Sequence, residues 1–210
     1  FRRGQNRCAT WLIVIYYFWI YLNTVKSKKM KKIIFFIIMI SLYSTKINSA
    51  YKQLAYDFSF KDLDGSEINL SEFKNKVIVV TNVASRCGFT YQYENLQEIW
   101  EIYQEKGLIV LGVPSNSFKQ ELNSNEEVKN FCEAKFGISF PMMQIVEVRG
   151  SDAHPFYIWA KENHGKAAVP KWNFHKIIIG KDGKIFDTFT SMTKPTSYKF
   201  IKSIETALNE

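Results

Sequence analysis

The sequence predicts an α/β fold in which helices flank a central sheet, and three observations support this. Residues 77–80 form a run of β-branched side chains, which is typical of a strand buried on both faces of a sheet. Residues 108–113 form a second buried strand pattern, and between the two runs Leu96, Ile99 and Tyr103 recur at helical spacing. A strand, a helix and a second strand in this order are expected to form a right-handed crossover between parallel strands.

The first fifty residues have the pattern of a targeting segment. Met30-Lys31-Lys32 is basic, residues 33–42 are apolar, and Asn48-Ser49-Ala50 ends in small side chains. We therefore expect residues 30–50 to be a signal peptide cleaved after Ala50, and residues 1–29 to be an upstream segment outside the mature protein. The protein is then exported, to a periplasm or to the medium. An uncleaved membrane anchor is the alternative, although each apolar run is shorter than the roughly 20 residues that span a bilayer.

Residues 51–210 are expected to form one domain of nearly neutral charge. The chain has 28 Lys and Arg and 20 Asp and Glu, but nine of the basic residues and none of the acidic ones lie in residues 1–50. The remaining 160 residues carry a net charge of −1, which provides no basic face for nucleic acid. They are of ordinary size for a single core, and no linker rich in Pro, Gly or Ser divides them.

The other elements follow from turn and capping patterns. Alternating residues before Asp64-Gly65 predict a hairpin, and Ser124 followed by Glu127 has the spacing of a capping box. Asp182-Gly183 predicts a second hairpin turn. The predicted elements are a hairpin in 56–70, helices in 90–106, 125–136, 154–161 and 196–208, and strands in 145–148, 177–179 and 184–190.

Cys87 is the first candidate for chemistry, because it lies between the end of a buried strand and the start of a helix. Unpaired N–H groups and the positive end of a helix dipole favour a thiolate there, and the adjacent Arg86 adds positive charge. In open α/β sheets the working site lies outside the carboxyl ends of the strands, where Cys87 is placed. The alternative is a buried, inert cysteine, which is the common state of free cysteines.

The stretch 82–90, NVASRCGFT, resembles the active-site motif N-V-A-S-x-C-G-x-T of the glutathione peroxidase family. The resemblance assigns the family's peroxidatic cysteine to Cys87. The strand-helix-strand order also resembles the thioredoxin fold, with a central mixed sheet flanked by helices. Residues 172–176 match the family's W-N-F-x-K motif, which places Trp172 and Asn173 at its active-site Trp and Asn. Indole N–H and amide NH₂ groups are neutral donors that stabilise charge on sulfur without giving it a proton.

The family's second motif is altered in this chain. Residues 113–121, VPSNSFKQE, resemble F-P-C-N-Q-F-G-x-Q-E, but Val113 replaces the Phe, Ser117 replaces the active-site Gln, and the loop is one residue shorter before Gln120. In the family this Gln donates a hydrogen bond to the peroxidatic sulfur. Ser117 can donate one with a shorter reach, and Gln120 or a water molecule can substitute. A plain strand-to-helix turn is the alternative for this loop.

Cys132 is the second cysteine of residues 51–210 and lies in the predicted helix 125–136. Its separation of 45 residues from Cys87 excludes a C-x-x-C pair. On the helical pattern alone Cys132 is a half-buried helix residue. In cysteine-type members of the family, a cysteine in this helix before a phrase like FGISFPM is the resolving cysteine, so the resemblance assigns that role to Cys132. A pair of cysteines in an exported protein also favours a disulfide.

The resemblance implies a thiol peroxidase without a metal or cofactor. Cys87 reduces hydrogen peroxide or an organic hydroperoxide, Cys132 forms a disulfide with it, and a thioredoxin-like dithiol or glutathione restores both thiols. Only 16 residues separate Pro155 from Trp172, and this short loop resembles the monomeric, thioredoxin-dependent branch of the family. We also expect a role in the response to oxidative stress.

Two other functions on the same fold are alternatives. An exported thiol–disulfide oxidoreductase normally uses C-x-x-C, but the fourth residue here is Thr90. A copper-binding module requires a second cysteine soon after Cys87, and position 91 is Tyr. The histidines are not spaced as ligands of one zinc site, so no metal is predicted; they are His154, His164 and His175.

Overall fold

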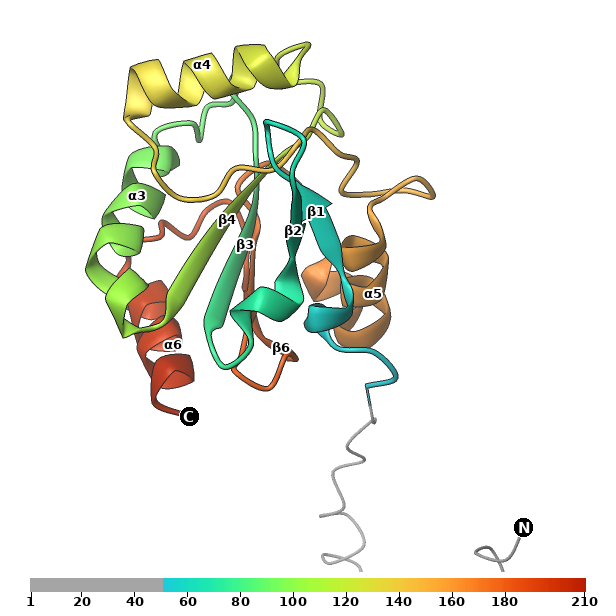
Figure 1. Cartoon of the computed structure of the whole chain (residues 1–210), viewed down its shortest axis with the longest axis vertical. Helices are drawn as coiled ribbons and strands as arrows, with labels where there is room; N and C mark the ends of the chain where they lie inside the picture. The colour runs from blue at the N-terminus through green and yellow to red at the C-terminus, as the bar shows by residue number, and fades with distance from the viewer. Residues whose placement is uncertain (1–50) are drawn as a thin grey trace, which may run out of the picture. The chain divides into compact units, whose positions relative to one another are not determined.

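The computed structural model describes residues 51–210, which form a four-stranded mixed sheet of order β4-β3-β5-β6 (Figure 1). Strand β3 (Val77–Val83) pairs in parallel with β4 (Leu108–Pro114) and antiparallel with β5 (Lys176–Ile179), which pairs antiparallel with β6 (Ile185–Phe189). The predicted α/β class and mixed sheet are confirmed. The predictions for residues 1–29 and for a signal peptide in 30–50 lie outside the described residues.

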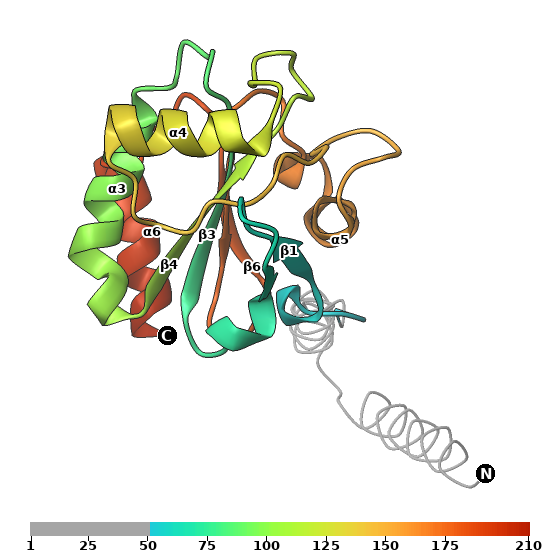
Figure 2. The ribbon, with the colours of Figure 1, turned by 45° about the horizontal axis from the view of Figure 1, so that its top comes forward.

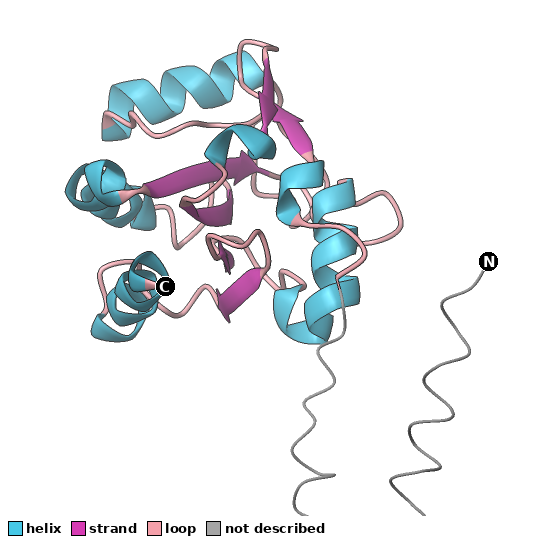
Figure 3. Cartoon of the chain, turned by 60° about the horizontal axis from the view of Figure 1, so that its bottom comes forward, coloured by secondary structure: helices cyan, strands magenta, loops and turns pink. Residues whose placement is uncertain are grey.

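Helices cover both faces of this sheet (Figures 1 and 3). Helices α3 (Gln92–Tyr103) and α6 (Tyr198–Asn209) lie on one face, and α5 (Pro155–His164) lies on the other with the hairpin of β1 (Ser59–Lys61) and β2 (Glu67–Asn69). Helix α4 (Asn125–Phe136) lies across the end of the sheet at which β3 and β4 finish (Figure 2). Short 3-10 helices are η1 (Ala55–Asp57), η2 (Leu70–Phe73), η3 (Gln104–Lys106) and η4 (Gly165–Ala168).

The alternation of side chains along β3 explains why the sheet is buried on both faces. Val77 and Val79 pack into the cluster with α3 and α6, whereas Ile78 and Val80 pack into the cluster with α5. Successive side chains of a strand point to opposite faces, so a continuous apolar run supplies both clusters. The carboxyl end of β3 is thereby held rigidly where the Cys87 turn begins.

Helix α4 has the bounds that its capping pattern predicts. Ser124 Oγ accepts the Glu127 N–H at 3.2 Å, which satisfies one unpaired donor of the first turn. At the other end Gly137 adopts a left-handed φ of 58°, and its N–H bonds to the Glu133 carbonyl at 3.1 Å. Cys132 therefore lies in a regular helix that is capped at both ends.

The predicted strand in 145–148 is wrong. Three of its N–H groups bond to unrelated acceptors and form no continuous ladder with a strand: Asn125 Oδ1, the carbonyl of Pro114 at the end of β4, and Ser117 Oγ. The apolar pattern of this segment reflects burial of its side chains. Its backbone N–H groups find their acceptors in two side chains and in the end of β4, so no strand is needed to satisfy them. Three helix bounds differ slightly from the prediction, since α3 is shorter, α5 ends at His164 and α6 begins at Tyr198. Within residues 51–210 no helix is both long and apolar enough to cross a membrane.

Candidate active site

Cys87 lies in the turn that leaves β3 and enters α3. Its sulfur accepts a hydrogen bond from the Phe89 N–H at 3.4 Å, and its own N–H is donated to Thr90 Oγ1 at 3.1 Å. The side chain is only 8 % exposed. A backbone N–H directed at the sulfur stabilises negative charge there, so the turn suits a nucleophilic thiolate.

Asn173 is held beside this turn by Gln120. The Asn173 amide Nδ2 donates to Gln120 Oε1 at 2.9 Å, and the Gln120 carbonyl accepts the Arg86 N–H at 2.9 Å. Asn173 is fully buried. Its Oδ1 has no hydrogen-bond partner within the part of the chain that the structure describes. The loop after β4 therefore joins the predicted donor Asn173 to the residue that precedes Cys87.

Asn82 on β3 fixes the backbone on both sides of Asn173. Its Nδ2 donates to the Trp172 carbonyl at 3.2 Å, and its Oδ1 accepts the His175 N–H at 3.1 Å. Phe174 has a φ of 62°, and the turn there buries Asn173 while Trp172 stays 42 % exposed. Sequence reasoning assigned no role to Asn82, although it is the first residue of NVASRCGFT.

Trp172 contributes to an apolar and cationic surface next to Asn173. Its ring packs against Phe118 with centroids 5.3 Å apart, and the Arg149 guanidinium lies 5.3 Å from the centroid of the Phe118 ring. We refer to these three side chains as the Trp172–Phe118–Arg149 surface. Sequence reasoning gave Phe118 and Arg149 no role, because they come from two loops that only the fold brings together.

Ser117 does not offer its hydroxyl proton to Cys87, contrary to the prediction. Its Oγ donates to Glu147 and accepts hydrogen bonds from the Ser115 hydroxyl and the Val148 N–H, each at 3.0 Å. A hydroxyl has a single proton, so none is left for the sulfur. The physical reason is that segment 145–148 passes beside the loop and binds it. Gln120, and not Ser117, contacts the buried amide of the site.

Cys132 belongs to the same buried cluster as Cys87. Burial raises the pKa of Cys132 to about 12; the Tyr93 hydroxyl acts in the opposite direction, and Glu121 and Glu133 raise it further. Both thiols are free in this structure. Cys132 is therefore a protonated thiol at neutral pH and a weak nucleophile in this conformation.

Tyr93 connects the surroundings of the two thiols. It is fully buried, and its ring lies against that of Phe136 at the end of α4, with centroids 5.3 Å apart. Burial raises the pKa of Tyr93, and Cys132, Glu121 and Cys87 all act in the same direction. Sequence reasoning did not identify Tyr93, whose only signal was its position six residues after Cys87.

Glu121 is a buried carboxyl that joins the two loops of the site. Its Oε1 accepts the Ser85 N–H at 3.0 Å and the Leu122 N–H at 2.8 Å. Burial raises the pKa of Glu121, whereas these hydrogen bonds and the charge of Arg86 lower it. Glu121 therefore holds the start of the Cys87 turn to the loop after β4.

His154 and His175 lie in separate surroundings. His154 caps α5, where its Nδ1 accepts the Phe156 N–H at 3.3 Å, and its ring stacks on Phe60 at 4.1 Å. Burial lowers the pKa of His175 to about 4, and the neighbouring Lys176 and Lys171 add to this effect. Across residues 51–210 no group of three or more His, Cys, Asp or Glu is placed to hold a metal ion.

Comparisons with known proteins place this geometry among peroxidases. The sequence model described as Glutathione peroxidase matches residues 55–161. The glutathione peroxidase-like peroxiredoxin 2 of Saccharomyces cerevisiae is 41 % identical over 148 residues, which are 68 % of this chain and 90 % of that protein. The hydroperoxy fatty acid reductase of Synechocystis sp. is 40 % identical over 149 residues, which are 67 % of this chain and 88 % of that protein.

Solved structures confirm the thioredoxin-like fold. The crystal structure of Trgpx in apo form superposes with a TM-score of 0.61 at 35 % identity, covering 75 % of this chain and 97 % of that chain. The secreted thiol-disulfide isomerase of Corynebacterium glutamicum superposes with a TM-score of 0.56 at 21 % identity, covering 73 % of this chain and 84 % of that chain. At this lower identity the second similarity concerns the fold alone.

Proposed function

Because the chain belongs to the glutathione peroxidase family and is a thiol peroxidase that reduces hydroperoxides, we propose that Cys87 is its peroxidatic cysteine and Cys132 its resolving cysteine. The observation that carries the proposal is the hydrogen bond from the Phe89 N–H to the Cys87 sulfur. Gln120 supports it by holding Asn173 beside the same turn.

In the first step the Cys87 thiolate attacks the outer oxygen of hydrogen peroxide or an organic hydroperoxide. An S–O bond forms as the O–O bond breaks, the departing hydroxide or alkoxide takes a proton from solvent, and Cys87 becomes a sulfenic acid. Asn173 has a second amide proton beyond the one donated to Gln120, and Trp172 has its indole N–H. These neutral donors stabilise the thiolate and the departing oxygen. Gln120 is a positioning residue.

In the second step the Cys132 sulfur attacks the sulfenic sulfur. The S–S bond forms, the S–O bond breaks, and the hydroxide leaves as water with the thiol proton. A disulfide requires Cα atoms within about 7 Å of each other. Helix α4 opens locally to bring Cys132 to Cys87, and the thiol, whose pKa burial raises to about 12, ionises more readily when water reaches it.

A thioredoxin-like dithiol then reduces the disulfide by exchange. The peroxiredoxin name of the yeast relative supports this donor over glutathione, and the name of the Synechocystis relative supports fatty acid hydroperoxides among the substrates. The protein acts as a monomer that is exported by residues 30–50 and protects against oxidative stress. The basic start, apolar run and Ala50 of that segment support export. Membrane contact follows only if the signal is not cleaved.

A thiol–disulfide oxidoreductase is the less favoured function. Thr90 stands where the second cysteine of C-x-x-C is required, and its hydroxyl binds the backbone of the turn, accepting the Cys87 N–H at 3.1 Å. The resulting geometry stabilises one reactive thiol in the turn and leaves the other in α4.

The test is peroxide consumption by the purified protein with thioredoxin, thioredoxin reductase and NADPH, in parallel with glutathione. The wild type is compared with Cys87→Ser and Cys132→Ser. Turnover with thioredoxin that is lost in both variants is the expected result. Turnover with glutathione that survives the loss of Cys132 refutes its resolving role, and a wild type inactive with both donors refutes the proposed function.

A further inference from the structure

A cavity of about 370 Å³ lies between the turn that contains Arg149, one side of α5, and Val169. Two cations, Arg149 and Lys161, line it. An adjoining cavity of about 200 Å³ shares Val169 in its wall and is lined by Lys166 and Lys171. The two cavities thus bring four cations together in a domain whose net charge is −1.

No carboxylate balances these cations within the cavities. Among the described residues that line the two cavities there is no Asp or Glu. Glu147 accepts the Ser117 hydroxyl proton, and Glu147, Asp152 and Glu162 all lie outside both linings. The local charge therefore favours an anionic ligand.

Tyr157 lines the larger cavity and carries a buried polar group. Its side chain lines the cavity and is 3 % exposed, and its hydroxyl has no hydrogen-bond partner anywhere in residues 51–210. A buried donor without a partner destabilises the folded state, and a bound acceptor removes this cost. Burial raises the pKa of Tyr157, so the hydroxyl stays protonated and remains a hydrogen-bond donor.

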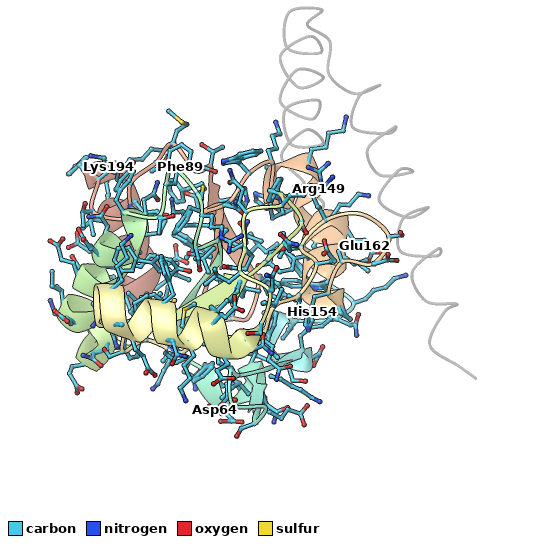
Figure 4. The ribbon with its side chains drawn as sticks, turned by 90° about the horizontal axis from the view of Figure 1, so that it is seen from above. Asp64, Phe89, Arg149, His154, Glu162 and Lys194 are labelled. Atoms are coloured by element: carbon cyan, nitrogen blue, oxygen red, sulfur yellow. The ribbon has the colours of Figure 1, made fainter. Side chains whose placement is uncertain are left out.

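The cavity is connected to the active site through the Trp172–Phe118–Arg149 surface. Arg149 lines the cavity and also lies over Phe118, whose ring packs on Trp172. Figure 4 looks onto the face formed by α4 and the loops at the strand ends, and Arg149 and Phe89, a near neighbour of Cys87, both lie on this face. A cationic pocket is thus followed by half-buried and exposed aromatic rings leading toward Trp172.

We propose that the cavity formed by Arg149, Lys161 and Tyr157 binds the carboxylate of a fatty acid hydroperoxide, while the acyl chain lies over Phe118 and Trp172. This inference rests on the proposed function of Cys87. A carboxylate pairs with both cations, and an alkyl chain suits the aromatic surface. Hydrogen peroxide has neither feature, so the cavity selects among substrates without taking part in the chemistry.

The test compares linoleic acid hydroperoxide with its methyl ester, which has the same chain and peroxide without the charge. Both are supplied below the concentration at which they form micelles, with thioredoxin as donor. The measured quantity is the ratio of kcat/KM for the acid to kcat/KM for the ester. The variants are the double substitution Arg149→Ala with Lys161→Ala, and Tyr157→Phe, with Lys202→Ala on α6 as the matched control.

The wild type should prefer the acid, and the double variant should lower the acid-to-ester ratio about fivefold or more, as expected for loss of partly exposed ion pairs. Tyr157→Phe should lower the acid-to-ester ratio less than the double variant, and Lys202→Ala should leave the ratio unchanged. Added salt should reduce the preference of the wild type for the acid. A ratio that is the same in the wild type and the double variant overturns the inference.

Hydrogen peroxide turnover distinguishes the two possible failures. A wild type that reduces hydrogen peroxide but shows no charge preference refutes only the carboxylate site. A wild type that reduces no peroxide refutes the proposed function on which the site depends. Oleate, which carries the carboxylate without a peroxide, should inhibit peroxide reduction in the wild type more strongly than in the double variant, and equal inhibition contradicts the proposal.

Discussion

Loosening helix α4 should accelerate the resolving step and leave the peroxidatic step unchanged. Ser124 Oγ caps the helix by accepting the Glu127 N–H at 3.2 Å. Replacing such a cap with Ala costs about 1 kcal/mol of helix stability. Under the proposal that Cys132 reaches Cys87 from the opened helix, Ser124→Ala should raise the open population, and with it the rate of disulfide formation, about fivefold.

Gly137 provides an independent perturbation at the other end of the same helix. Its φ of 58° is left-handed, and a Cβ added there meets no atom within 4 Å, so Gly137→Ala strains only the backbone. The expected cost of about 1 kcal/mol again predicts a several-fold faster resolving step. Ser197→Ala is the matched control, because Ser197 precedes α6 without a side-chain cap bond.

The assay mixes reduced protein with one equivalent of hydrogen peroxide. Peroxide loss reports the first step, and trapping of free thiols at intervals reports the disulfide. Hydrogen exchange over residues 125–136 measures whether the helix opens more often in each variant. If exchange becomes faster in Ser124→Ala while the disulfide forms at the wild-type rate, opening of α4 does not limit resolution and the reasoning is refuted.

Three further predictions follow from the buried groups. The pKa of His175 in the folded protein, about 4, lies below its value in the unfolded chain. The free energy of unfolding should therefore fall by roughly 3 kcal/mol as the pH drops from 6.5 to 4. His175→Phe should remove this loss, as measured by urea unfolding. Gln120→Ala should slow peroxide reduction about tenfold, because it frees the buried amide beside the turn, whereas Ser117→Ala should change the rate less than about twofold. Alkylation of Cys132 in Cys87→Ser should rise about tenfold per pH unit from pH 7 to 10, because burial raises the pKa of its thiol to about 12.

Each of these has a contradicting outcome. If the free energy of unfolding of His175→Phe changes with pH between 4 and 6.5 as steeply as that of the wild type, the histidine is not buried as a neutral group. His164→Phe, at an exposed histidine, is the control. A larger loss in Ser117→Ala than in Gln120→Ala, measured by peroxide loss in a single turnover, restores Ser117 as the donor. An alkylation rate that levels off near pH 8.5, measured by mass spectrometry, excludes a buried Cys132 thiol.

Local sequence patterns were sufficient for the fold class and for much of the site. The β-branched run of 77–80, the capping residue Ser124 and the turn at Asp182-Gly183 each specify a structure through interactions within a few residues. For the same reason Cys87 could be placed at the end of a strand, because neighbouring residues decide where a strand ends and a helix begins.

The partners of the site residues were decided only by the tertiary structure. Ser117 was one of three donors that the sequence offered to the sulfur, but Glu147, thirty residues away in sequence, accepts its hydroxyl proton. Gln120 accepts a hydrogen bond from Asn173, which lies 53 residues later in the sequence. Tyr93 lies beside helix α4, which begins more than thirty residues after it. A hydrogen bond or a buried charge depends on which distant segments pack together, and no pattern within one segment carries that information.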